Sequence, residues 1–292
     1  MRYTLRQLEV FLSVARHQSV SQAAHELAMS QSAVSGALGD LEGQFDLALF
    51  DRIGRRLQLS ALGAALRPQA ESVLAQALQL ERAFAHQDEP GVLRIGATLT
   101  IGNYVVAALI ARYMRENPGT RVQLDVANTA EIARKVENFE IDVGMIEGEL
   151  AHPELDVQAF GGDSLTVFCA PSHPFASKRS LDDDDLRSAE WIVRESGSGT
   201  RQAFDRAMHG ILSQLHLRLE LQHTEAIKSA VAEGLGLGCV SYIAVAEEVK
   251  RGQLALCELP GRDLRRQFFS VLHRKKYRGV HIERWLALCQ LG

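Results

Sequence analysis

The chain has 292 residues, a formal net charge of −4, a pI of about 6.2 and a hydrophobic content of 46%. This length exceeds one typical domain, so two or three folded units are expected. No apolar run reaches the roughly 18 residues needed to cross a bilayer, and the amphipathic start lacks the apolar core of a signal peptide. The sequence therefore predicts a cytoplasmic protein with no membrane partner.

The cysteines and histidines show no spacing that is typical of a metal site or a catalytic site. Cys169, Cys239, Cys257 and Cys289 lie far apart, without a CxxC pair or paired histidine spacing. Buried, reduced thiols are the simplest interpretation, and no metal site is expected. The ten histidines are scattered, and no Ser/His/Asp or Cys/His set falls into one place. The sequence therefore predicts no catalytic residues and a protein that is not an enzyme.

Three helix start signals open the chain. Thr4 to Gln7 has the spacing of a capping box, Ser19 repeats that signal, and Ser30 is placed to cap a third helix after a short turn at 28–30. Apolar residues at helical spacing form the inward stripe of the third helix: Val34, Leu38, Leu41 and Phe45. This pattern predicts a helix-turn-helix.

The outward face of the third helix carries Gln31, Ser32 and Ser35, and Gly36 and Gly39 leave its backbone bare. A glutamine can pair with adenine edges in the major groove, while serines and a helix N-terminus suit phosphates. This face therefore predicts a reader of double-stranded DNA.

A basic hairpin follows the third helix. Two short extended pieces surround Gly54 and place Arg52, Arg55 and Arg56 near the phosphate backbone, as in the wing of a winged helix. The alternative is a solvated hairpin without a partner. Residues 1–60 hold six basic and six acidic side chains, so a monomer should bind DNA weakly and oligomers are needed.

Residues 60–88 supply a means of oligomerisation. Ser60 is the expected cap of one long helix in which Leu59, Leu66, Val73 and Leu80 repeat every seven residues. A second row, mostly of small residues, has the same period: Gly63, Ala70, Ala77 and Phe84. Such a seam predicts pairing with a second copy, and the alternative is a helix packed on its own chain. Pro68 should kink its first turns, and a polar break at 86–91 ends the segment.

From residue 92 strands alternate with helices. Strands are predicted at 92–97, 122–127, 141–146, 165–170, 191–194, 217–221, 237–242 and 268–273, with helices near 103–116, 129–138, 202–214, 225–233, 243–250 and 280–290. Such alternation is typical of parallel sheets covered on both faces. Two sets of elements predict two α/β lobes with a cleft between them.

Two segments of that cleft are suited to an anion. The stretch 98–102 follows the first strand and opens a helix, aiming hydroxyls and free N–H groups at the sheet's carboxyl edge. The stretch 196–201 does the same in the second lobe and adds a cation. Their equivalent places in facing lobes predict a small-anion cleft.

The segments LRQL at 5–8, SQAAHELAMSQSAVSGALGDLE and LFDRIGRRLQLSALG resemble those of LysR-type transcriptional regulators, and the resemblance extends over essentially the whole chain. It implies an α+α/β architecture: a winged helix-turn-helix at 1–60, a dimerising linker helix at 61–90, and a two-lobed effector domain like that of periplasmic binding proteins at 91–292. Lobe I would comprise 91–161 and 268–292, and lobe II 162–267. The recognition helix falls on 31–45 and the wing on 51–59. At Gly36 and Ala37 many members carry basic or bulkier polar side chains.

The resemblance also implies function. Members act as homodimers or homotetramers whose DNA bending changes when a small metabolite binds, with RNA polymerase as a further partner. LRIGATLTIGNY, GMIEG and RESGSGTR resemble the branch that includes regulators of sulfur assimilation and Calvin-cycle carbon fixation, whose effectors are small oxyanions or phosphorylated metabolites. No other cofactor is expected. The residues predicted by position to line the effector site are Thr98, Thr100, Ser196, Gly199, Thr200, Glu147 and Arg201.

Glu147 beside an anion would be unfavourable unless it is protonated or pairs with a cation such as Arg201. Two other classes of protein remain as alternatives. A transport protein that binds solutes would need a signal peptide and no helix-turn-helix. An α/β enzyme would need a convergent acid, base or nucleophile in the cleft.

Overall fold

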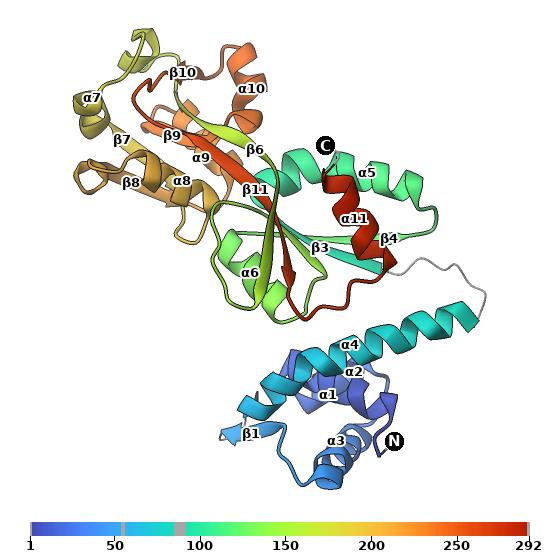
Figure 1. The fold of residues 1–292 in the computed structure, drawn as a ribbon. Helices are drawn as coiled ribbons and strands as arrows, with labels where there is room; N and C mark the ends of the chain where they lie inside the picture. The colour runs from blue at the N-terminus through green and yellow to red at the C-terminus, as the bar shows by residue number, and fades with distance from the viewer. Residues whose placement is uncertain (1, 54–55, 85–91, 291–292) are drawn as a thin grey trace.

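A computed structural model describes residues 2–53, 56–84 and 92–290. Figure 1 shows a helical N-terminal domain, one long helix and two α/β lobes in chain order. In the described part of the chain, no helix is both long and apolar enough to cross a membrane.

The N-terminal domain is built on three capped helices: α1 (Leu5–His17), α2 (Val20–Glu26) and α3 (Gln31–Phe45). The predicted caps are confirmed. Thr4 and Gln7 form a reciprocal capping box, and Ser19 and Ser30 each accept a hydrogen bond from a backbone N–H of the first turn. Each cap satisfies a donor that the helix leaves unpaired, so these short polar residues determine where the helices begin.

The inward stripe of α3 is confirmed in part. Val34, Leu38 and Leu41 are buried against residues of α1 such as Phe11. Phe45, the last residue of α3, is 42% exposed, and its ring lies tilted against the ring of Tyr3, with 6.3 Å between the centroids. Placing Phe45 in the core was wrong, because α3 ends there and the chain turns away through a left-handed residue at Asp46.

The predicted wing consists of two antiparallel strands, β1 (Phe50–Ile53) and β2 (Arg56–Leu59). Arg52 and Arg56 lie on these strands, while Gly54 and Arg55 lie outside the described residues. Ser60 then accepts a hydrogen bond from the N–H of Gly63 at 2.9 Å and begins α4 (Ala61–Phe84), as predicted.

The heptad seam on α4 is only partly free to meet a second copy. Ala70 is buried in the N-terminal core, and a Cβ at Gly63 would stand 2.2 Å from a backbone oxygen of Leu49. Reading the Gly63–Ala70 row as an interchain seam was therefore wrong, because these small residues let α4 lie close on its own domain. Val73 and Leu80 of the other row remain exposed.

The first lobe contains β3 (Val92–Thr98), β4 (Arg121–Ala127) and β5 (Val143–Glu147), with η1 (Ile101–Val105), α5 (Val106–Glu116), α6 (Thr129–Glu137) and α11 (Val280–Gln290) around them. Its strands β4, β3 and β5 are parallel neighbours. The fully buried Trp285 of α11 packs edge-on against Tyr113 of α5 and anchors the C-terminal helix on this lobe.

The second lobe contains β7 (Glu190–Arg194), β8 (His216–Leu221), β9 (Leu237–Ser241) and the short β10 (Ala255–Cys257). Its helices are η2 (Pro174–Ser177), α7 (Asp183–Ser188), α8 (Gly199–Ala207), η3 (Leu212–Gln214), α9 (Thr224–Ala232) and α10 (Tyr242–Lys250). The prediction of one helix over 202–214 was wrong. The helix α8 ends at Ala207, and the left-handed Gly210 separates it from η3.

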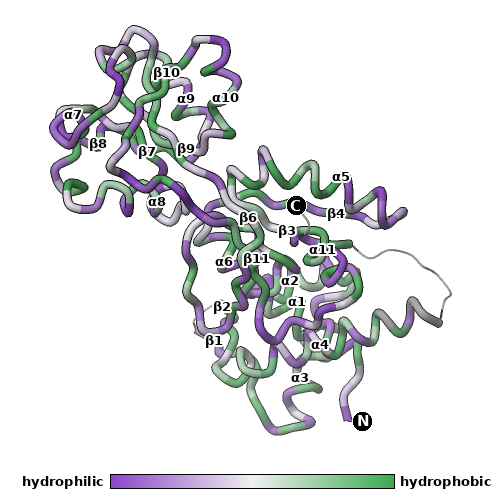
Figure 2. Tube along the Cα trace, turned by 45° about the horizontal axis from the view of Figure 1, so that its top comes forward, coloured by the Kyte–Doolittle hydropathy of each residue, from purple (hydrophilic) through white to green (hydrophobic). Residues whose placement is uncertain are grey.

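Two long strands join the lobes: β6 (Leu155–Cys169) and β11 (Arg265–His273). They pair antiparallel with each other, and β6 continues into lobe II beside β9 and β10. The predicted strand at 165–170 is thus the end of a strand of 15 residues. The expectation of parallel sheets was wrong for the joining strands, because β11 runs antiparallel to β5 and β6, and β6 runs antiparallel to β9. Figure 2 shows a hydrophilic stretch of chain where the joining strands pass between the lobes.

Each lobe closes over its own apolar core. The core of lobe II includes Trp191, Phe204 and Cys169, and that of lobe I includes Ile95, Met145 and Trp285. All four cysteines are buried and free, as predicted. The sulfur atoms of Cys169 and Cys257 lie 3.6 Å apart on the paired strands β6 and β10.

Candidate anion site between the two lobes

Four of the predicted residues meet where the lobes touch. Thr98 and Thr100 follow the carboxyl end of β3, Glu147 ends β5, and Thr200 lies in the first turn of α8. Each is at most 2% exposed. The carboxyl edge of the lobe I sheet therefore faces the start of α8, as the sequence predicts.

Glu147 is held by lobe I. The hydroxyl of Thr98 donates to its Oε2, and the backbone N–H of Thr100 points at Oε1 from 3.4 Å. The N–H of Glu147 in turn donates to the hydroxyl oxygen of Thr98 at 3.2 Å. The carboxylate is thereby fixed at the junction with almost no contact with solvent.

Arg266 is the central residue of the site, and the sequence analysis missed it. Its side chain projects from β11 with 1% exposure and donates to Thr200 Oγ1 at 2.9 Å and to Thr100 Oγ1 at 3.1 Å. One guanidinium therefore bonds to a threonine from each lobe. Strand alternation was the available signal, because Arg266 shares the inward face of β11 with the buried Phe268 and Ser270.

Two carboxylates balance this cation. Asp163 of β6 accepts from Arg266 Nε at 2.6 Å and from Nη2 at 2.9 Å, and Glu147 Oε1 lies 3.6 Å from Nη1. Burial alone would lower the pKa of Arg266, but the hydrogen bonds to Asp163 and the charges of Glu147 and Asp163 outweigh burial and raise it. Arg266 is therefore permanently charged in a nearly dry site.

The lobes are joined by further direct hydrogen bonds beside this cluster. Thr129 of lobe I donates to the carbonyl oxygen of Glu147 at 3.0 Å and accepts from the N–H of Gly199 at 3.1 Å. The N–H of Ala130 donates to the carbonyl oxygen of Gly197 in lobe II. Gly199 thus lies at the point of closest approach, and the site is closed in this structure.

Two of the predicted site residues are not part of the cluster. Ser196 is exposed, and the cap of α8 is the buried Ser198 two residues later. Arg201 turns away from the cluster and pairs with Asp205 and Glu220, both at distances under 3 Å. The interpretation of Arg201 as the partner cation of Glu147 is corrected by the position of Arg266, because Arg201 lies on the far side of α8.

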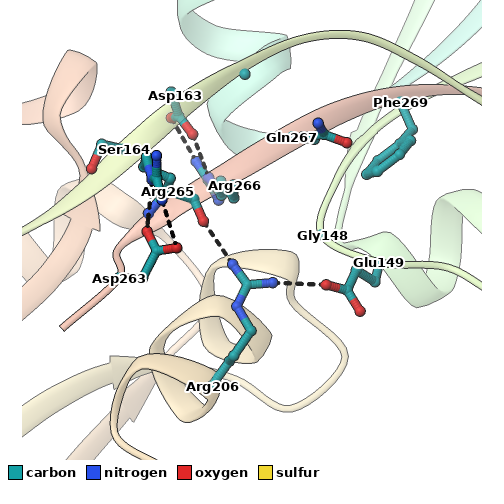
Figure 3. A pocket seen from close by; sticks show the side chains of 11 residues that line it. Gly148, Glu149, Asp163, Ser164, Arg206, Asp263, Arg265, Arg266, Gln267 and Phe269 are labelled. Atoms are coloured by element: carbon teal, nitrogen blue, oxygen red, sulfur yellow. Dashed lines mark hydrogen bonds and ion pairs between the residues drawn. The ribbon is translucent and has the colours of Figure 1, made fainter.

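A cavity of about 830 Å³ opens beside the joining strands and reaches Arg266 and Asp163 (Figure 3). On its rim Arg206 of α8 pairs with Glu149 of lobe I at 2.9 Å. Glu149 also bonds through its backbone to the side chain of Gln202. The cavity lies against the face of β11 that carries Arg265, Gln267 and Phe269, and charged side chains from both lobes border it.

The predicted DNA-contacting face of α3 is open. Gln31, Ser32 and Ser35 are exposed, and no atom lies within 4 Å of a Cβ built at Gly36 or Gly39. Nothing in the described part of this chain covers that face. This face of α3 is therefore open enough to enter a groove of double-stranded DNA.

Comparison with known proteins now identifies the family. Residues 5–64 match the model for the bacterial regulatory helix-turn-helix protein, lysR family, and residues 86–291 match the LysR substrate binding domain. The chain belongs to the LysR family. It is 40% identical over 289 residues to the uncharacterized transcriptional regulator YeiE of Escherichia coli K12, covering 99% of this chain and 98% of YeiE.

Two further LysR-type relatives locate the chain within the family. It is 32% identical to the RuBisCO operon transcriptional regulator of Allochromatium vinosum, covering 94% of this chain and 92% of the relative. The regulatory domain of CcmR from Synechocystis PCC6803, solved in complex with 2-PG, superposes with a TM-score of 0.63 at 28% identity, covering 69% of this chain and 96% of that domain. The Calvin-cycle side of the resemblance is confirmed.

Family membership settles the class of this LysR-type protein. It is a DNA-binding transcriptional regulator with a winged helix-turn-helix and a separate two-lobed effector domain. The transport and enzyme alternatives are both excluded, because the match covers the DNA-binding and effector parts together and its relatives are regulators.

Proposed function

We propose that this LysR-type regulator senses a small oxyanion or phosphorylated metabolite at Arg266, and that anion binding changes how its oligomer binds or bends DNA. The observation that carries the proposal is the bond from one buried guanidinium to Thr100 of lobe I and Thr200 of lobe II. An anion that reaches Arg266 must disturb both bonds, so binding and lobe orientation are linked. The complex of CcmR with 2-PG, a small anionic metabolite, supports this class of effector.

The proposed contacts come from both lobes. Thr98, Thr100 and Glu147 contribute from lobe I, and Gly199 and Thr200 contribute from the start of α8. Arg266 supplies the positive charge, and threonine hydroxyls and helix N–H groups supply neutral donors. Such a set suits a small anion with several oxygens.

Thermal unfolding of the full chain tests the proposal. The panel contains sulfite, sulfate, thiosulfate, phosphate, phosphoenolpyruvate and common carboxylates. An effector at about 100 times its dissociation constant should add roughly 2.7 kcal/mol of stability. Thr200→Ala should abolish that stabilisation, whereas Ser196→Ala, in the exposed loop, should retain it. A panel without any stabilising anion, or an equal effect of both variants, would contradict the site.

For the DNA-binding domain we propose that Gln31, Ser32 and Ser35 contact the major groove and that the wing arginines Arg52, Arg55 and Arg56 contact phosphates. Exposure of the α3 face supports the first assignment. We further propose pairing of copies through α4, a cytoplasmic location and RNA polymerase as a partner at promoters. A promoter-binding regulator works where DNA and polymerase are.

A further inference from the structure

The buried cluster already carries more negative than positive charge. Arg266 faces two carboxylates, Asp163 and Glu147, and all three side chains are at most 4% exposed. An anion that joined them would bring like charges together in a site with little water to screen them, which is strongly unfavourable. If an anion binds there, as proposed above, a proton must accompany it.

The two carboxylates differ in how well they are satisfied. Asp163 accepts two bonds from Arg266 and a third from the hydroxyl of Ser241 at 2.5 Å. Among the described residues, the nearest donors to Glu147 Oε1 are the Thr100 N–H at 3.4 Å and Arg266 Nη1 at 3.6 Å. Oε1 of Glu147 therefore keeps a lone pair free, beside the same Thr100 and Arg266 that would hold an anion.

We propose that the bound anion and Glu147 share one proton, so that the site selects oxyanions that carry a proton of their own. A ligand O–H donates to Oε1 of Glu147, while the other ligand oxygens accept from Arg266 and the threonine hydroxyls. Such an O–H···O⁻ bond is short and strong. An oxyanion without a proton meets the acceptor Oε1 with an acceptor of its own, so it binds more weakly.

The charged groups around Glu147 are few. Lobe I contributes the uncharged hydroxyls of Thr98, Thr100 and Thr129, and α8 contributes Gly199. From β11 comes Arg266, and from β6 comes Asp163. Cys239 of β9 lies near Arg266, but burial raises its pKa to about 12, so the thiol is neutral. Glu147 is thus the carboxylate best placed to accept a hydrogen bond from a ligand.

The experiment compares matched anions by unfolding of the full chain. Phosphate and arsenate keep a proton near neutral pH, whereas sulfate and selenate, of similar size and shape, do not. The wild-type chain should prefer phosphate over sulfate, and arsenate over selenate, by about 10- to 100-fold in affinity. Glu147→Gln replaces the acceptor by an amide that can also donate, so this preference should vanish or reverse.

A second variant separates hydrogen bonding from general charge. Asp163→Asn removes one negative charge from the same cluster but leaves the Glu147 acceptor in place. It should tighten binding of all four anions and keep the preference.

The outcomes are distinguishable. If anions bind and Thr200→Ala weakens them, yet Glu147→Gln leaves the preference unchanged, this inference is overturned while the anion site stands. Equal wild-type affinities for phosphate and sulfate would overturn it as well. If no anion stabilises the wild-type chain, the proposed site fails, and this inference fails with it.

Discussion

Gly199 of lobe II lies directly against Glu147 of lobe I: a Cβ at position 199 would stand 1.8 Å from the carbonyl oxygen of Glu147. No side chain fits at this distance, so the closed arrangement requires glycine there. Gly199→Ala should push the lobes apart and cost about 1–3 kcal/mol of stability, as overpacking does. Calorimetry of the full chain should show the lower unfolding temperature and a loss of stabilisation by the effector anion.

The matched control for this variant is Gly261→Ala in lobe II, where no atom lies within 4 Å of the added methyl group. It should leave both quantities unchanged. An unaltered anion response in Gly199→Ala would show that the lobes need not touch at this point.

The glycines of α3 lead to a prediction in which stability and DNA affinity move in opposite directions. Gly36 and Gly39 lie in an exposed helix interior with open space around them. Alanine there should raise the free energy of unfolding by about 0.5–1 kcal/mol per site. DNA affinity should fall, because the added methyl groups lie between the helix backbone and the groove.

Gly43→Ala is the natural comparison, since Gly43 is equally open but nearer the C-terminal end of α3, away from the predicted base-reading residues. It should gain stability without losing affinity in a fluorescence anisotropy titration. Unchanged affinity for Gly36→Ala and Gly39→Ala would place this face of α3 away from the DNA.

The wing arginines should act on affinity rather than on sequence choice. Changing Arg55 and Arg56 together to alanine should weaken binding to all DNA sequences alike. Each lost phosphate contact should also reduce the slope of log affinity against log salt by about 1. Titrations at several salt concentrations measure both effects. An unaltered slope would show that the wing arginines do not contact the phosphates.

Base readout is tested separately at the N-terminal end of α3. Gln31→Ala should relax discrimination at one or two base positions, since glutamine there can pair with adenine edges. Binding to an operator series with single base changes measures the effect. A uniform loss over all sequences would instead assign Gln31 to a phosphate.

The exposed apolar stripe of α4 should hold the oligomer together. Leu62, Val73 and Leu80 are 44%, 39% and 54% exposed and lie 11 and 7 residues apart, which places them on one face of the helix. Val73→Asp with Leu80→Asp should dissociate the oligomer in light-scattering measurements of mass. Leu78→Asp, exposed to a similar extent on another face, should not.

His273 should make stability depend on pH. Burial lowers its pKa from the usual 6.5, although the charge of Glu154 opposes this, and its Nδ1 accepts a hydrogen bond from the N–H of Lys275. The unfolded chain therefore binds a proton at a higher pH than the folded one, so stability should fall as the pH drops below about 6.5. His273→Asn, which keeps an acceptor but cannot titrate, should flatten this slope in pH-dependent melting curves.

The local signals in the sequence predicted the N-terminal domain well, because its boundaries depend on neighbours in the chain. Thr4, Ser19, Ser30 and Ser60 each cap a helix within three residues of their own position. Such short-range bonds are readable without knowledge of the fold. The packing of Gly63 and Ala70 on their own domain was not, since a seven-residue period shows which residues share a face of α4 but not which partner that face contacts.

Arg266 could not be assigned in the same way. Its partners Asp163, Thr100 and Thr200 lie between 66 and 166 residues away in the chain. In the sequence it is one of two adjacent arginines, and the side chain of Arg265 on the outward face pairs with Asp263. Arg201 is closer in the sequence to the start of α8, so it was predicted as the cation of the site. The pairing of β6 with β11 places Arg266, and not Arg201, at the junction of the lobes.

The joining strands have one more consequence. Because β6 and β11 pair with each other where they join the lobes, with one register shift between Phe268 and Phe269, the lobes share a two-stranded ribbon rather than a loose linker. Such a ribbon resists stretching but can change its twist. A ligand at Arg266, near the lobe II end of this ribbon, would therefore act on its twist. A rotation of a few degrees at the guanidinium would displace the far ends of the lobes by a larger distance. Such a rotation between the lobes is the kind of movement that would change how an oligomer bends DNA.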